Sequence, residues 1–131
     1  MPAFTTKDQA VDVFTELFEI LLNDATFSRI VREENLSAHF VHTKPDLEIF
    51  VDSDGVRIDD VPYAAALKIK MSCDTADSLW AGRLLMPIAV AMGKIRIKGS
   101  VAKVLEFVPL LHPAFDRYPG IATAAGVGGA H

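Results

Sequence analysis

The sequence has little cysteine and no long uninterrupted apolar segment. Cys73 is the only cysteine among the 131 residues, so an internal disulfide is impossible and a reducing compartment is expected. The longest apolar run, Leu84–Met92, is shorter than the roughly 20 residues of a membrane-spanning helix, and Pro87 interrupts it. The N-terminus lacks the basic and then apolar pattern of a secretory signal. These absences predict a cytoplasmic protein.

A positive net charge and the short motifs of common enzyme classes are also missing. The formal net charge is −4, which argues against a nucleic-acid binder because such domains are usually basic. The sequence has no glycine-rich phosphate loop, nucleophile elbow or HExxH motif. His39 and His42 would point to opposite faces of a strand, and His112 with Asp116 supplies too few metal ligands. We therefore expect no catalytic residues, no metal and no cofactor.

Apolar side chains, in contrast, are abundant. Half of the residues are hydrophobic, and the mean hydropathy is +0.27. The length fits a single domain, which we place at residues 1–120, with a Gly/Ala-rich flexible tail at residues 121–131. The apolar excess has two explanations, a dimer interface or an internal apolar cavity.

Hydrophobic periodicity predicts the order helix, helix, four strands, helix, helix, strand, helix, helix. Thr6-x-x-Gln9 is a capping-box pattern that begins the first helix, and Asp24 can cap the second. Asp54-Gly55 is a strong hairpin signal because it supports positive φ angles. Strands with one apolar face predict one sheet with a solvated side and a side covered by helices.

The segment Leu84–Val108 is the most informative part of the chain. It predicts an apolar helix over Leu84–Met92, an alternating strand over Lys94–Lys98, and an amphipathic helix capped by Ser100. Three elements with apolar faces in succession must enclose a common apolar space.

Two further helices flank this segment. Asp74 is expected to cap a helix that carries Leu79, Trp80 and Leu84, and Gly82 is expected to end its regular part. Pro119-Gly120 is expected to end a last short helix at Tyr118.

Three stretches resemble the sterol carrier protein type 2 family. They are the hairpin Leu47–Ile58, the passage Lys68–Asp74 into the helix with Trp80, and Met92–Gly99, which is similar to the family's Gly-Lys-apolar-Lys-apolar-Lys-Gly strand. The resemblance extends from the first helix to Val108. It implies an α+β fold with a mixed five-stranded sheet covered on one face by helices. It also implies an apolar tunnel between sheet and helices that holds acyl chains, sterols or other lipids.

The chain departs from the family pattern in two places. Residues 87–92 lack the polar Gln and Lys side chains that the family usually carries before the Gly-Lys strand. The chain ends in Gly-Gly-Ala-His, whereas peroxisomal members end in Ser-Lys-Leu or a similar signal. Headgroup recognition and localisation therefore do not carry over.

The leading hypothesis is a carrier of an apolar lipid, such as a fatty acyl chain, an acyl-CoA or a sterol-like molecule, without catalysis. Burial of each CH₂ contributes about 0.8 kcal/mol, so a strong polar anchor is unnecessary. A membrane surface, a lipid-metabolising enzyme or a second copy are further candidate partners. The predicted wall residues are Phe14, Leu17, Leu21, Trp80, Leu84, Met86, Ile88, Met92, Ile95, Leu105, Val108 and Leu111.

Two alternatives remain open. The apolar face could serve a protein-interaction or dimerisation module, or the chain could be a small α+β enzyme acting on an apolar substrate through His39, His42 or Asp116. The cationic faces of residues 68–70 and 94–98 have two interpretations as well. They are either solvated sheet surface paired across strands with Glu48 or Asp52, or contacts for anionic headgroups.

Overall fold

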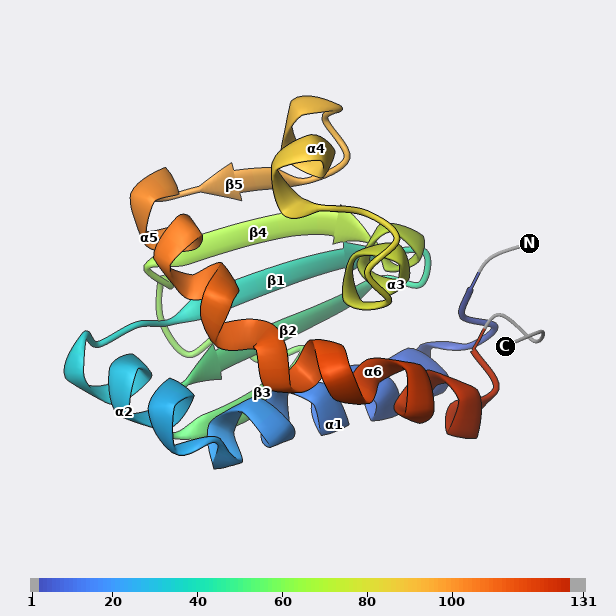
Figure 1. The fold of residues 1–131 in the computed structure, drawn as a ribbon, viewed down its shortest axis with the longest axis horizontal. Helices are drawn as coiled ribbons and strands as arrows, with labels where there is room; N and C mark the ends of the chain where they lie inside the picture. Colours follow the sequence, from blue (N-terminus) through green and yellow to red (C-terminus); the bar gives the residue numbers. More distant parts are fainter. Residues whose placement is uncertain (1–2, 128–131) are drawn as a thin grey trace.

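A five-stranded mixed sheet organises the computed structural model, which describes residues 3–127, the side chains of residues 101 and 105 excepted. The strand order is β3-β2-β1-β4-β5 (Figure 1). The β1–β4 pair is parallel and the other pairs are antiparallel. The fold is thus the expected α+β arrangement. The strands are β1 (Ala38–Thr43), β2 (Leu47–Asp52), β3 (Gly55–Ile58), β4 (Leu67–Ser72) and β5 (Arg96–Lys98).

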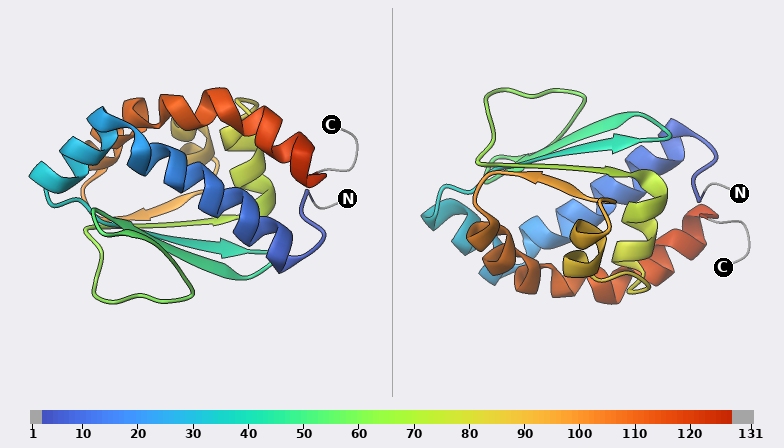
Figure 2. Two further views of the ribbon diagram at one scale, coloured as in Figure 1. Left: turned by 90° about the horizontal axis from the view of Figure 1, so that it is seen from below. Right: turned by 90° about the horizontal axis from the view of Figure 1, so that it is seen from above.

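The helices cover one face of this sheet, and the loop of residues 59–66 crosses the other (Figure 2). The α1 and α6 helices pack side by side in the helical layer. Because α1 is near the start of the sequence and α6 is near its end, segments from both parts of the chain form the helical layer together. The elements are α1 (Lys7–Asn23), α2 (Ala25–Glu33), α3 (Cys73–Trp80), α4 (Met86–Ala91), α5 (Val101–Phe107), the 3₁₀ turn η1 (Val108–Leu111) and α6 (His112–Ala125).

The main core lies between the sheet and α1. Phe14, Leu17 and Leu21 of α1 are completely buried. Ile49 and Ile69, on the facing side of β2 and β4, are buried with them. The alternation of the strands therefore sets which side of the sheet receives the helices.

Three predicted helix starts are confirmed by their hydrogen bonds. Thr6 Oγ1 accepts from the Gln9 amide at 3.1 Å, and Asp24 Oδ2 accepts from the Phe27 amide at 3.0 Å. Ser100 Oγ accepts from the amide of residue 103 at 3.3 Å. Each side chain satisfies one of the amides that a helix start leaves unpaired. The predicted order of elements is confirmed as well, with η1 added where Pro109 interrupts the helical hydrogen bonding.

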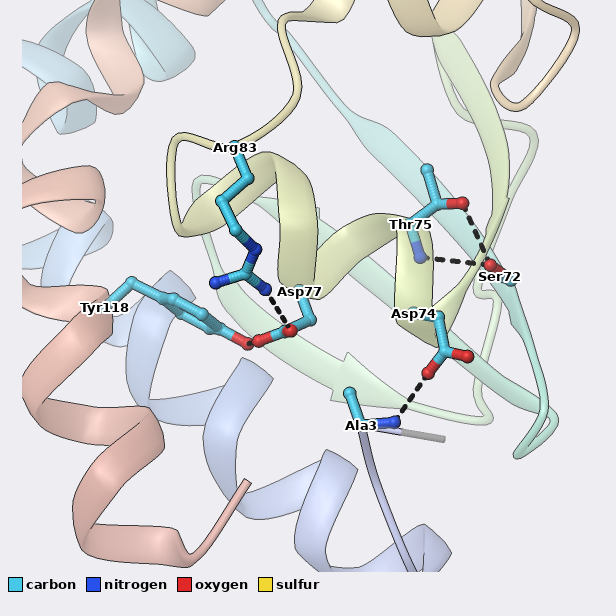
Figure 3. A network of polar contacts seen from close by, with 7 residues as sticks. All are labelled: Ala3, Ser72, Asp74, Thr75, Asp77, Arg83 and Tyr118. Carbon is cyan, nitrogen blue, oxygen red and sulfur yellow. Dashed lines mark hydrogen bonds and ion pairs between the residues drawn. The ribbon is translucent and has the colours of Figure 1, made fainter. Parts of the chain in front are cut away.

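The start of α3 differs from the prediction. Ser72, not Asp74, is the cap, and its Oγ accepts from the Thr75 amide at 3.0 Å (Figure 3). Asp74 lies in the first turn and accepts from the Ala3 amide at 2.7 Å. The helix ends at Trp80 and Gly82 follows with a φ of 80°, which confirms the predicted end of its regular part. Leu84, which was expected to belong to this helix, lies in the loop beyond it.

The last strand is also shorter than predicted. The amides of Lys94 and Ile95 both donate to the carbonyl of Ala89, so these residues close the end of α4 and β5 begins at Arg96. Gly99 ends β5 with a φ of 122°. A Cβ at this position would lie 2.6 Å from the Ala66 carbonyl oxygen, so the close approach of the two backbones requires glycine.

The predicted end of the last helix at Tyr118 is wrong. The α6 helix continues through Pro119 to Ala125, and Gly126 ends it with a φ of 76°. Pro119 is exposed, whereas Ile121 and Val127 are buried. The energy of burying these side chains outweighs the loss of one helical hydrogen bond. Residues 128–131 of the expected tail lie outside the described residues.

Candidate functional site

An apolar pocket opens where the end of α3, the following loop, η1 and the start of α6 meet. Its volume is about 400 Å³, within the range of small-molecule sites. Its walls come from two segments of the chain, residues 79–87 and residues 108–115. The lining residues are Leu79, Trp80, Ala81, Gly82, Leu84, Leu85, Met86, Pro87, Val108, Leu111, His112 and Phe115.

Trp80 forms a fixed wall of this pocket. It is the last residue of α3 and is buried. Its indole lies 5.1 Å from the Phe115 ring and 6.0 Å, edge-on, from the Phe18 ring, measured between centroids. These distances are typical of favourable aromatic pairs. The indole is thus held between the sheet-covering core and the pocket.

The local sequence explains how the second wall is presented. Pro109 cannot donate a helical hydrogen bond, so the chain tightens into η1 before α6 begins. This turn places Val108 and Leu111 toward the pocket, and Phe115 follows one helical turn after Leu111. On the wall formed by residues 79–87, Leu85 is 61% exposed, so an apolar side chain lies at the opening of the pocket.

Five of the predicted wall residues are brought together here. These are Trp80, Leu84, Met86, Val108 and Leu111.

The other predicted residues lie elsewhere or outside the description. Phe14, Leu17 and Leu21 are filled core on α1, and Ile95 is buried at the end of α4. Ile88 and Met92 face outward, with 49% and 60% of their surface exposed. The side chain of Leu105 is outside the described part.

Several lining residues were not predicted, most notably Phe115 and His112. Phe115 follows Leu111 at a spacing of four, a helical signal that was available in the sequence. His112 lies on the pocket wall and is exposed. Together with the Trp80 indole N–H it supplies the side-chain polar groups of an otherwise apolar lining.

The titratable residues considered for catalysis lie away from the pocket. His39 Nε2 lies 3.0 Å from Glu48 Oε1 on the outer side of the sheet. His42 lies on the core side, stacked on Phe14 at 4.8 Å, and its burial lowers its pKa to about 4. Asp116 is exposed and not part of the lining. Within residues 3–127 no group of three or more His, Cys, Asp or Glu side chains could hold a metal ion.

A buried polar contact joins the two pocket-bearing helices (Figure 3). Tyr118 Oη of α6 donates to Asp77 Oδ1 of α3 at 2.6 Å, and Arg83 Nη2 donates to Asp77 Oδ2 at 2.6 Å. Burial and the neighbouring carboxylate raise the pKa of Tyr118. Burial also raises the pKa of the Cys73 thiol to about 12, so this cysteine is an unreactive core residue.

Comparison with known proteins identifies the architecture. No family model and no curated protein sequence matches the chain. Solved structures do match. Sterol carrier protein 2 from Yarrowia lipolytica, in its apo form, is 16% identical, with a TM-score of 0.64 over 87% of this chain and 98% of that one. The sterol carrier protein domain 2 of Helicoverpa armigera is 18% identical, with a TM-score of 0.67 over 89% and 97%. The chain has the sterol carrier protein 2 fold.

A third match to this fold carries a ligand. Sterol Carrier Protein-2 from Aedes aegypti, solved in complex with the C16 fatty acid palmitate, is 19% identical, with a TM-score of 0.61 over 80% of this chain and 96% of that one. The resemblance predicted from the sequence is therefore confirmed at the level of the fold. In addition, none of the helices in the described range has both the length and the hydropathy needed to span a bilayer.

Proposed function

We propose that this chain binds the acyl chain of a lipid in the pocket beside Trp80 and carries it without chemical change. The observation that carries this proposal is the apolar lining of the pocket, built from Trp80, Leu84, Met86, Leu111 and their neighbours. An acyl chain in such a space gains about 0.8 kcal/mol for each CH₂ removed from water. The palmitate complex of the Aedes aegypti protein of the same fold supports the choice of ligand class.

The lining also supports a carrier rather than an enzyme. Of the side chains that line the pocket, His112 is the one of a type that commonly serves as a general acid or base. It lies at the exposed side of the wall, where it could instead donate a hydrogen bond to a carboxylate. His39, His42 and Asp116 do not reach this space.

A pocket-filling variant tests the proposal. Val108→Phe places a larger side chain in the pocket wall, whereas Val61→Phe makes the same change at a 40% exposed position of the loop on the other face of the sheet. Displacement of a fluorescent fatty acid by palmitate is measured for both variants. We expect Val108→Phe to weaken binding at least tenfold, the equivalent of about 1.4 kcal/mol, and Val61→Phe to bind like the natural chain.

Native mass spectrometry of the freshly purified chain supplies an independent reading. A bound species with the mass of a fatty acid or related lipid is expected. A chain that is free of ligand and also fails to bind the fluorescent fatty acid would refute the proposal. Unchanged binding by Val108→Phe, in a variant that melts like the natural chain, would place the lipid elsewhere.

A further inference from the structure

The α4 helix exposes apolar side chains beside the pocket mouth. Between Leu84 and Met92 every residue is apolar, and all except Leu84, Met86 and Ala89 are exposed. Leu85 and Met92 each expose about 60% of their surface, and Ile88 exposes 49%. Pro87 of the same segment lines the pocket. An apolar surface of this kind marks an interaction site.

The residues that follow are cationic, although the chain as a whole is acidic. None of the 17 Asp and Glu residues lies between Asp77 and Glu106. Lys94, Arg96 and Lys98 are all exposed, and no salt bridge is found for them among the described residues. The positive charge is therefore concentrated immediately after the apolar segment.

The sheet places still more positive charge at the same edge. Lys68 of β4 is directly opposite Lys98 of β5, and Lys70 is opposite Arg96. Like charges in this arrangement repel each other. Glu48 and Asp52, the acidic residues considered as partners, are instead bonded to His39 and Tyr63. The β4–β5 edge therefore carries like charges side by side, and an external anion bound there would reduce the repulsion between them.

The α4 helix and the β5 strand lie at the same edge of the molecule. Figure 1 shows α4 next to the β5 edge, at the end of the molecule opposite α1 and α2, and Figure 2 shows the same relationship from above. The α4–β5 surface is defined here as Leu85, Ile88, Val90, Met92, Lys94, Arg96 and Lys98.

We propose that the α4–β5 surface docks on an anionic lipid bilayer. The apolar side chains of α4 enter the headgroup boundary while the cations of β5 contact lipid phosphates, the combination that holds peripheral proteins at membranes. The mouth of the pocket, next to Leu85 and Pro87, then faces the bilayer. Lipid could enter or leave the pocket there without crossing water.

The charges favour a bilayer over a second copy of the chain. A twofold contact through α4 would place the same surface on both subunits. Lys94, Arg96 and Lys98 of each copy would then approach one another with no acidic residue from positions 78–105 to compensate. An anionic bilayer supplies the missing negative charge.

Vesicle flotation tests the proposal, with phosphatidylcholine vesicles that contain or lack phosphatidylglycerol. The natural chain should bind the anionic vesicles and lose this binding at high salt, because the screening length falls from about 10 Å at 0.1 M to about 3 Å at 1 M. Arg96→Gln with Lys98→Gln should weaken binding about 25-fold, since one cation near an anionic surface is worth about 1 kcal/mol or fivefold. Arg29→Gln with Arg32→Gln, two exposed cations on α2, is the matched control and should change little.

A second pair of variants tests the apolar part. Ile88→Ser should weaken binding to the anionic vesicles severalfold, and Val61→Ser, on the opposite face of the sheet, should not. All of these positions are exposed, so the melting temperatures should stay near that of the natural chain. Binding of fatty acid in the absence of vesicles should also be retained, which separates this proposal from the function of the pocket.

Three results would overturn the proposal. One is equal binding to vesicles with and without phosphatidylglycerol. Another is equal loss in the α2 and β5 charge variants, which would indicate a general electrostatic attraction. The third is failure to bind vesicles together with a sedimenting dimer that Ile88→Ser dissociates, because the occupant of α4 would then be a second copy.

Discussion

The hydroxyl of Tyr118 donates to Asp77 across 41 positions of sequence, at 2.6 Å and out of contact with water. A second tyrosine, Tyr63, donates to Asp52 at 2.7 Å but is 50% exposed. The two bonds share their chemistry and differ in burial. They form a matched pair for measuring what the buried contact contributes.

Removing the Tyr118 hydroxyl should destabilise the fold. Tyr118→Phe leaves one buried oxygen of Asp77 without its donor, which costs about 1–3 kcal/mol. Tyr63 is half exposed, so water can replace the hydroxyl that Tyr63→Phe removes, and this variant should cost less than about 1 kcal/mol. Urea denaturation at neutral pH measures both. Equal losses in the two variants would contradict the assigned importance of the Asp77 contact.

Stability should fall in mild acid because of His42. Burial lowers its folded pKa to about 4, whereas the unfolded chain has the ordinary value of 6.5. Below pH 6.5 the unfolded state binds more protons, so stability is full above this pH and decreases as pH falls toward 4. The loss should reach about 2 kcal/mol between pH 7.5 and pH 5.

His42→Leu is the comparison for this titration. The variant has no group to protonate at this position and should show a flatter pH dependence of its urea midpoint over the same interval. If it loses stability in parallel with the natural chain, another group is responsible.

Trp80 should report the arrival of lipid. The indole lines the pocket, so an acyl chain beside it removes water and should shift its emission to the blue. Affinity should rise about fourfold with each added CH₂ until the pocket is filled, the equivalent of about 0.8 kcal/mol. Titration with saturated fatty acids of increasing length measures this. Lipid binding detected by displacement with no change at Trp80 would exclude this pocket.

His112 should distinguish a fatty acid from its alcohol. It is the exposed polar side chain of the pocket wall, and one hydrogen bond contributes about 0.5–1.5 kcal/mol. His112→Ala should therefore weaken palmitate by about 2- to 10-fold and affect hexadecanol less. The same loss for both ligands would mean that His112 acts through packing alone.

The end of α6 should be required for stability. A chain truncated after Gly120 loses the buried side chains of Ile121, Ala122 and Val127 and should lose about 2–5 kcal/mol. It also loses the hydrogen bond from Gln9 Nε2 to the Ala125 carbonyl, 2.8 Å long. A chain truncated after Val127 keeps these contacts and is the reference. Identical thermal melts would show that residues 121–127 add nothing.

The sequence predicted those features that depend on neighbouring residues. Capping by Thr6, Asp24 and Ser100 and the hairpin turn between Asp52 and Gly55 rest on local hydrogen bonds and φ preferences, and the structure confirms them. The mixed sheet was inferred from the order of the strands and the family resemblance. Its parallel β1–β4 pair joins segments about 30 residues apart.

The errors arose where distant segments decide the outcome. Ser72 and Asp74 are both good helix caps by type, and Asp74 is engaged instead by the Ala3 amide. Pro119-Gly120 normally ends a helix, but burial of Ile121 and Ala122 holds α6 together beyond it. Local pattern contains no information on such tertiary contacts.

The pocket was likewise predicted in part, because its lining depends on both local pattern and tertiary contacts. Trp80, Leu84, Met86, Val108 and Leu111 were predicted to line one apolar space because of their apolar character and the family resemblance, and they do lie around one pocket. The apolar pattern could not separate filled core from pocket lining, since Phe14 and Leu111 are both large apolar residues. Only the tertiary arrangement places Phe14 against His42 and Leu111 beside the opening.

The short pairing of β5 with β4 indicates where local unfolding of the sheet should begin. Only three residue pairs hold β5 in the sheet, and two of them are Lys68 with Lys98 and Lys70 with Arg96. The backbone amides of this edge should exchange hydrogen for deuterium earlier than those of β1 and β2. Because α4 connects directly to β5, local unfolding of the strand would release the segment that borders the pocket. Neutralising this repulsion with bound anions should slow that exchange.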